Sequence, residues 1–157
     1  GNTETAKHWS WQDAPGTQAA RLTGITVEGE SDIHFIDEPI SIRFEAMLSE
    51  EIALPAELNF SLVIGTVEEA VVFNVGSEAK FCNARQLTAT CTIPANLLND
   101  ETYTIRILLV KDRSVPLFDL HQILTFTMQE RNRDSNWHGK WIGVTRPQQM
   151  VNWTFEP

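Results

Sequence analysis

The fold class is decided by one stretch of ten residues, Pro39-Ile40-Ser41-Ile42-Arg43-Phe44-Glu45-Ala46-Met47-Leu48. Its even-numbered residues are apolar, and its odd-numbered residues are mostly polar. Successive side chains point to opposite faces of a β-strand, so this alternation places all the apolar side chains on one face. The stretch therefore predicts a strand with one face in a core and the other toward water.

The same period of two recurs in seven further segments along the chain, namely 21–28, 58–64, 71–75, 87–93, 103–110, 124–128 and 151–155. No stretch has a sustained helical period, and we expect at most one short helical turn at 65–70 and another at 119–124. About eight short strands separated by Gly, Pro, Asn and Asp predict an all-β fold, an antiparallel β-sandwich of immunoglobulin-like or jelly-roll-like type.

A local feature at 94–103 fits this class. A turn there leads to Tyr103 at the start of a strand, where a tyrosine corner would return the phenol to an upstream backbone group. An ordinary aromatic residue at a strand start is the alternative interpretation.

The chain of 157 residues is long enough for one domain with its own core. Residues 1–20 show no period, and we expect a lead-in segment whose Trp9 and Trp11 dock on a single sandwich over residues 21–157. No apolar run approaches the ~18 residues that a membrane span needs. Residues 1–11 have neither a basic cluster nor an apolar stretch, so no signal peptide is predicted.

Charge and cysteine content exclude several classes of function. Twelve Lys and Arg face 21 Asp and Glu, for a net charge of -9, which disfavours nucleic acid and anionic membrane partners. Cys82 and Cys91 are too few for a disulfide framework or a zinc site. We favour two reduced thiols, although the sequence also allows a disulfide between these two cysteines.

A search for catalytic motifs finds none. The sequence has no phosphate loop, no GxGxxG and no GxSxG, which disfavours an ATPase, a dinucleotide enzyme and a serine hydrolase. No two histidines have ligand spacing, so we expect no metal, no cofactor and no catalytic residue. Asp119 and His121 are two residues apart at a strand edge, and a solvated loop is the preferred prediction over contact with a ligand. A carboxylate pair for glycoside cleavage is a further hypothesis that nothing in the sequence favours.

The remaining features are polar strand faces and five tryptophans. Sugar rings present apolar C–H faces and a rim of hydroxyls, which aromatic and polar side chains can bind together. Carbohydrate binding is therefore one option that the composition allows.

Three motifs carry a resemblance to a known family. The first is His8-Trp9-Ser10-Trp11-Gln12-Asp13-Ala14-Pro15-Gly16 followed by Arg21-Leu22. The second is Ile93-Pro94-Ala95-Asn96-Leu97-Leu98-Asn99 followed by Tyr103. The third is Gly139-Lys140-Trp141-Ile142-Gly143-Val144-Thr145-Arg146-Pro147 followed by Trp153. In this order and spacing, which covers nearly the whole chain, they resemble the C-terminal domain of the ATP-binding subunit of ABC transporters that export O-antigen and related polysaccharides, the Wzt type.

The resemblance implies a β-sandwich that acts as a carbohydrate-binding module and performs no catalysis. Such a domain recognises the finished, lipid-linked glycan, often at its non-reducing end, beside the transporter's ATPase and membrane subunits. It implies a cytoplasmic position at the inner face of the bacterial inner membrane. It also implies a homodimer with exchanged C-terminal strands. Trp141 and Trp153 are expected to fill core or dimer surfaces, and Pro147 to set the entry to the last strand.

The matching motifs look like scaffold, so the candidate glycan-binding residues come from the polar strand faces. Arg43 and Glu45 are the first candidates. Asn59, Ser61, Asn74 and Arg106 are the second set, on strands expected to neighbour the first. Ordinary solvent exposure is the alternative for each of them. The alternative function is a structural sandwich used only for dimerisation or protein interaction.

Overall fold

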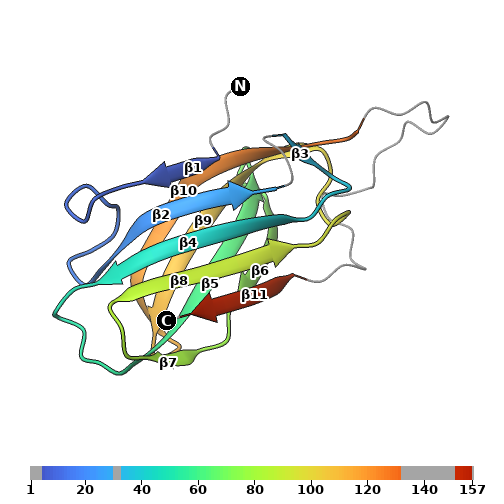
Figure 1. Ribbon diagram of the computed structural model, residues 1–157. Coiled ribbons are helices and arrows are strands. Elements are labelled where there is room, and N and C mark those ends of the chain that lie inside the picture. Colours follow the sequence, from blue (N-terminus) through green and yellow to red (C-terminus); the bar gives the residue numbers. More distant parts are fainter. Residues whose placement is uncertain (1–4, 30–32, 132–150, 157) are drawn as a thin grey trace.

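The computed structural model describes residues 5–29, 33–131 and 151–156, which form eleven β-strands (Figure 1). The strands are β1 (Ala6–His8), β2 (Ala20–Glu28), β3 (His34–Phe35), β4 (Ile40–Leu48), β5 (Ala56–Thr66), β6 (Val71–Gly76), β7 (Lys80–Cys82), β8 (Gln86–Ile93), β9 (Glu101–Lys111), β10 (Val115–Gln129) and β11 (Asn152–Glu156). All eight predicted strands are present. The count of eight was too low, because β1, β3 and β7 are too short to show a period.

The strands form two sheets that face each other as a sandwich, which confirms the predicted fold class. The five-stranded sheet has the order β1-β2-β4-β8-β11, and the six-stranded sheet has the order β3-β10-β9-β5-β6, with β7 paired to β5. Strands of the front sheet run across those of the rear sheet in Figure 1. One pairing departs from the antiparallel prediction, because β3 runs parallel to β10.

The core lies between the sheets, where the alternation of the sequence places the apolar side chains. Strand β4 alternates strictly between buried and half-buried residues, as does β5. Phe44 of β4 and Phe60 of β5 are fully buried and stack across the two layers with their ring centroids 6.2 Å apart. Burial of each such side chain contributes about 1.5–3 kcal/mol to folding. The opposite, half-buried faces of both sheets are therefore left for function.

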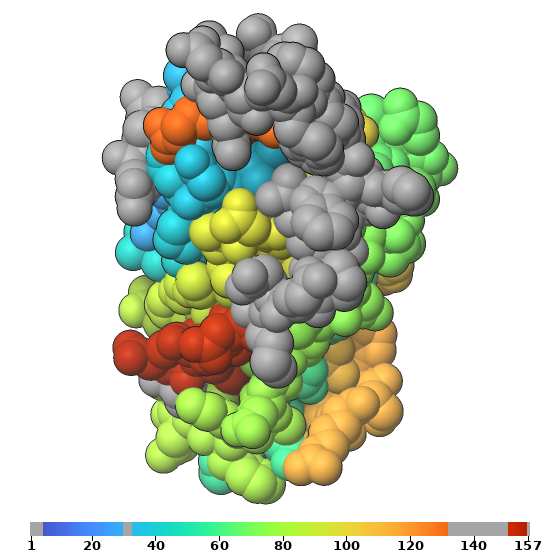
Figure 2. All heavy atoms as spheres, turned by 90° about the vertical axis from the view of Figure 1, so that its right-hand side faces the viewer, coloured from blue at the N-terminus to red at the C-terminus, as the bar shows by residue number. Residues whose placement is uncertain are grey.

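Strand β11 closes one flank of the sandwich. It pairs with β8 and directs Trp153 and Phe155 toward the core. The Phe155 ring meets Phe60 of the other sheet edge-on at 5.2 Å, and Lys80 Nζ donates a hydrogen bond to the Phe155 carbonyl at 3.0 Å. Figure 2 shows β11 in red on this flank, beside β8 and close to the green β6–β7 segment. Residues 139–147 of the tail motif, with Trp141 and Pro147, lie outside the described residues.

The tyrosine corner is confirmed. The Tyr103 hydroxyl is fully buried and donates a hydrogen bond of 2.8 Å to the Asn99 carbonyl, four residues upstream. The Tyr103 ring also packs on Phe126 at 5.5 Å. This contact fixes the connection between β8 and β9, where the chain passes from one sheet to the other.

Two helical turns predicted from the sequence are absent. Residues 119–124 belong to β10, and residues 65–70 form the end of β5 and a turn closed by a hydrogen bond from the Thr66 amide to the Ala70 carbonyl at 2.8 Å. Neither segment is long enough for a helix to compete with the sheet ladder beside it. No helix among the residues that the structure describes is long and apolar enough to cross a membrane.

The segment before β2 contributes strand β1 to the five-stranded sheet and also packs on the sandwich through its side chains. Trp9 packs against the core, and the Arg21 guanidinium lies 4.5 Å over the Trp11 ring. Cys82 and Cys91 are both buried and free. Burial raises the pKa of Cys91 to about 12, so its thiol stays protonated and unreactive at neutral pH.

Candidate functional site

The six candidate glycan-binding residues lie on opposite outer faces of the sandwich. Arg43 and Glu45 are on β4 of the five-stranded sheet. The other four, Asn59, Ser61, Asn74 and Arg106, are on β5, β6 and β9 of the six-stranded sheet. The expectation that these strands neighbour β4 is wrong, because β4 pairs with β2 and β8. A single site therefore cannot use both sets.

Arg43 and Glu45 form part of an exposed charge cluster. Arg43 Nη2 lies 3.5 Å from Glu45 Oε1, and Arg43 Nε lies 3.7 Å from Glu28 Oε1. Pairs of this exposure and length contribute little to stability, about 0–1 kcal/mol. The contacts match the alternative interpretation of these residues as solvent-facing charges.

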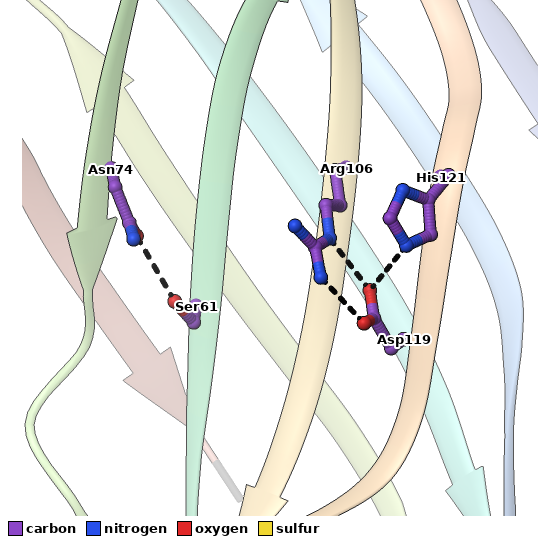
Figure 3. A network of polar contacts seen from close by, with 5 residues as sticks. All are labelled: Ser61, Asn74, Arg106, Asp119 and His121. Carbon is purple, nitrogen blue, oxygen red and sulfur yellow. Dashed lines mark hydrogen bonds and ion pairs between the residues drawn. The ribbon is translucent and has the colours of Figure 1, made fainter. Parts of the chain in front are cut away.

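The second set lies together on the outer face of the six-stranded sheet. In the strand register, Asn74 of β6 is opposite Val63 of β5, and Val63 is opposite Arg106 of β9. Ser61 Oγ donates to Asn74 Oδ1 at 3.3 Å (Figure 3). Neighbouring strands are about 4.8 Å apart, so Asn74 and Arg106 are separated by about 10 Å across the face.

A bulge in β10 shapes the surface beside Arg106. Leu120 pairs with Ile107 and Leu124 pairs with Ile105, so β10 uses two more residues than β9 over this stretch. The bulge leaves Arg106 without a register partner on β10 and turns His121 outward. Bulges commonly re-aim side chains in this way next to binding sites.

Arg106, Asp119 and His121 form a polar network over β9 and β10 (Figure 3). Arg106 donates from Nε to Asp119 Oδ1 at 2.8 Å and from Nη2 to Asp119 Oδ2 at 2.6 Å. His121 Nε2 lies 3.4 Å from the same Oδ1. The two hydrogen bonds from Arg106 lower the pKa of Asp119, and the same bonds raise the pKa of Arg106. The carboxylate is therefore ionised and held in place at neutral pH.

A depression of about 420 Å³ opens next to this network. Residues from four strands and one turn line it: Val63, Gly65, Glu69, Val71, Thr104, Arg106, His121 and Gln122. We call it the outer-face depression. Of the predicted residues only Arg106 lines it, whereas Asn59 lines a separate hollow with Ser77, Glu78, Ala79 and Arg113.

Local backbone conformation sets the shape of the outer-face depression. Glu69 and Gln122 both have positive φ angles, of 69° and 49°, which residues other than glycine seldom adopt. At Gly65 an added Cβ would lie 3.1 Å from the Ala70 carbonyl oxygen and 3.4 Å from Thr104 Oγ1. A side chain there would crowd the floor between β5, β9 and the turn.

Sequence reasoning undervalued Asp119 and His121. They were expected in a solvated loop but lie on β10, facing Arg106. The available signal was the broken alternation at 119–124, which marks a bulge as readily as a turn.

Phe81 of β7 is a second residue that the sequence analysis did not identify. It is 72% exposed and pairs with Glu57, on the same outer face as Asn59.

The network does not have the chemistry of a glycosidase acid. A general acid needs a carboxyl with a raised pKa, and Arg106 lowers the pKa of Asp119 instead. Among the residues that the structure describes, no cluster of three or more His, Cys, Asp or Glu could hold a metal ion. The face offers paired charges, hydroxyls, amides and aliphatic patches, which suit reversible binding.

Comparison with known proteins identifies a structural neighbour. Neither a protein-family profile nor a curated protein sequence matches the chain. The crystal structure of the C-terminal domain of Wzt superposes with a TM-score of 0.64, covering 85% of this chain and 93% of that one, at 9% sequence identity. At this identity the likeness shows a shared fold.

Proposed function

We propose that this chain is a non-catalytic carbohydrate-binding domain that recognises the non-reducing end of a lipid-linked O-antigen polysaccharide for export by an ABC transporter. The observation that carries the proposal is the fold shared with the C-terminal domain of Wzt over 85% of the chain. The sequence motifs that resemble the same family support it independently of the coordinates.

The binding surface we propose is the outer face of the six-stranded sheet, centred on the outer-face depression. Val63 and Val71 offer aliphatic area for the C–H face of a sugar ring, while Thr104, Arg106 and Gln122 offer hydrogen-bonding groups for hydroxyls. Asn59, Ser61 and Asn74 extend the polar surface along β5 and β6. Phe81 of β7, which pairs with Glu57 near the start of β5, supplies an exposed aromatic ring for a second sugar.

The proposal includes an assembly. In the full protein the domain would work beside the ATPase and membrane subunits of the transporter, at the cytoplasmic face of the inner membrane. It would form a homodimer by exchanging its C-terminal strands. Strand β11 suits exchange because it is an edge strand that docks through two aromatic residues, Trp153 and Phe155, onto a core made by other strands.

Glycan binding is tested by calorimetric titration with a panel of purified O-polysaccharides that includes the polymer of the source strain. We expect micromolar or weaker affinity, since a shallow surface buries little area and must order a flexible chain. Dimerisation would raise the apparent affinity through avidity.

Two matched variants locate the site. We expect Arg106→Ala to weaken binding by at least about tenfold, as for the loss of a charged hydrogen-bond donor. Arg43→Ala removes a guanidinium from the five-stranded sheet and should leave binding unchanged. If Arg43→Ala weakens glycan binding and Arg106→Ala does not, the site lies on the five-stranded sheet instead. Binding to none of the glycans would contradict the proposal and leave the dimerisation module as the better account.

A further inference from the structure

Carboxylates outnumber Lys and Arg around the outer-face depression. Arg106 is the single Lys or Arg among its lining residues, and both oxygens of Asp119 bind it. A second carboxylate, Glu69, lines the depression from the turn before β6. Two carboxylates therefore face one permanent cation in this neighbourhood.

We propose that the outer-face depression selects a neutral, hydroxyl-rich sugar residue and rejects one that carries a phosphate or carboxylate. This rests on the proposed function, since it names the chemistry of the glycan end that the same site accepts. The protein's own carboxylate, Asp119, already offsets the charge of the one arginine that lines the depression.

The donors that remain suit hydroxyl groups. The two bonds to Asp119 use two of the five N–H donors of Arg106, so Nη1 keeps both of its protons for a ligand. Thr104 contributes a hydroxyl and Gln122 an amide, which can each donate and accept. A sugar hydroxyl also donates and accepts, and can therefore bond to Glu69 as well as to Arg106.

A phosphate or carboxylate on the sugar is disfavoured in the outer-face depression by the carboxylates nearby. Asp119 leaves the Nη1 edge of Arg106 open, but an anion that binds there meets a cation whose charge Asp119 already offsets, and it lies beside that carboxylate. Glu69 adds repulsion from the other side of the depression. The net charge of -9 on the whole chain disfavours the approach of an anion from solution.

The test compares two oligosaccharides that differ only in a phosphate monoester on the terminal residue, together with inorganic phosphate as a minimal probe. Binding is measured by titration calorimetry and by amide chemical shifts. We expect the native chain to bind the neutral oligosaccharide at least about tenfold more tightly than the phosphorylated one. This difference in affinity should decrease when added salt screens the electrostatic repulsion.

Asp119→Asn removes the negative charge that offsets Arg106. We expect it to increase the affinity for phosphate and for the phosphorylated oligosaccharide about tenfold. Glu28→Gln is the matched control, because it removes a carboxylate beside Arg43 on the opposite sheet. Glu69→Gln is a second variant, expected to give a smaller gain, and it carries the test if Asp119→Asn does not fold.

Tighter binding of the phosphorylated oligosaccharide by the native chain would overturn the inference and leave the proposed function standing. Binding of neither oligosaccharide would count against the proposed function. In that case inorganic phosphate still decides the inference, because equal phosphate binding by Asp119→Asn and Glu28→Gln would refute it and a gain confined to Asp119→Asn would support it.

Discussion

Replacement of Phe155 by alanine tests how β11 holds the sandwich together. The Phe155 side chain is 3% exposed and meets Phe60 of the opposite sheet edge-on. Truncation of a buried phenylalanine costs about 3–5 kcal/mol, as lost transfer free energy and a cavity. At about 2–4 °C per kcal/mol for a protein of this size, the melting temperature should fall by about 6–20 °C.

The assay is urea unfolding followed by circular dichroism, with a thermal melt as a second measure. Glu156→Ala is the matched control, since it changes the next, exposed residue of β11 and should alter the unfolding free energy by less than about 0.5 kcal/mol. A loss below about 1 kcal/mol for Phe155→Ala would refute the reasoning that β11 is an integral part of the core.

The same experiment bears on strand exchange when it is repeated over a tenfold range of protein concentration. If β11 docks on a partner chain, the unfolding midpoint of the native protein should rise with concentration, because association stabilises only the folded state. A midpoint independent of concentration would contradict the exchanged dimer while leaving the effect of Phe155→Ala intact.

Two further predictions concern the tyrosine corner and the polar network. Tyr103→Phe removes the hydrogen bond to the Asn99 carbonyl and should cost about 1 kcal/mol in urea unfolding, and an unchanged midpoint would count against the corner. Because Arg106 lowers the pKa of Asp119, the ion pair should survive mild acid and be lost only as pH falls below the usual aspartate range. Carboxyl NMR should show the Asp119 titration midpoint rising in Arg106→Gln, and equal midpoints in the two proteins would contradict the network.

The strands could be predicted from the sequence because their signal is local. The alternation in β4 and β5 reports one buried face whatever the strand pairs with, and it placed all eight longer strands. Strands β1, β3 and β7 have two or three residues each, which is too few to reveal a period. Their existence depends on partners supplied by distant parts of the chain.

The site was harder to predict because it depends on sheet membership. Arg43 and Arg106 both lie on the polar phase of a strand and look equivalent in the sequence, yet the pairing of their strands places them on opposite faces of the molecule. Asp119 and His121 lost their strand signal because the bulge interrupts the alternation. The motifs that suggested the family lie largely in turns and scaffold, and so gave no contact residues.

The bulge in β10 has a consequence for how such a domain can diversify. Its extra residues are not matched one to one by β9, so exchange of the exposed ones, His121 and Gln122, should have little effect on the ladder. Within the bulge, His121 and Gln122 line the outer-face depression, whereas Ile123 packs against the core. Substitutions at His121 and Gln122 can therefore change the chemistry of the outer-face depression while the interior stays unchanged.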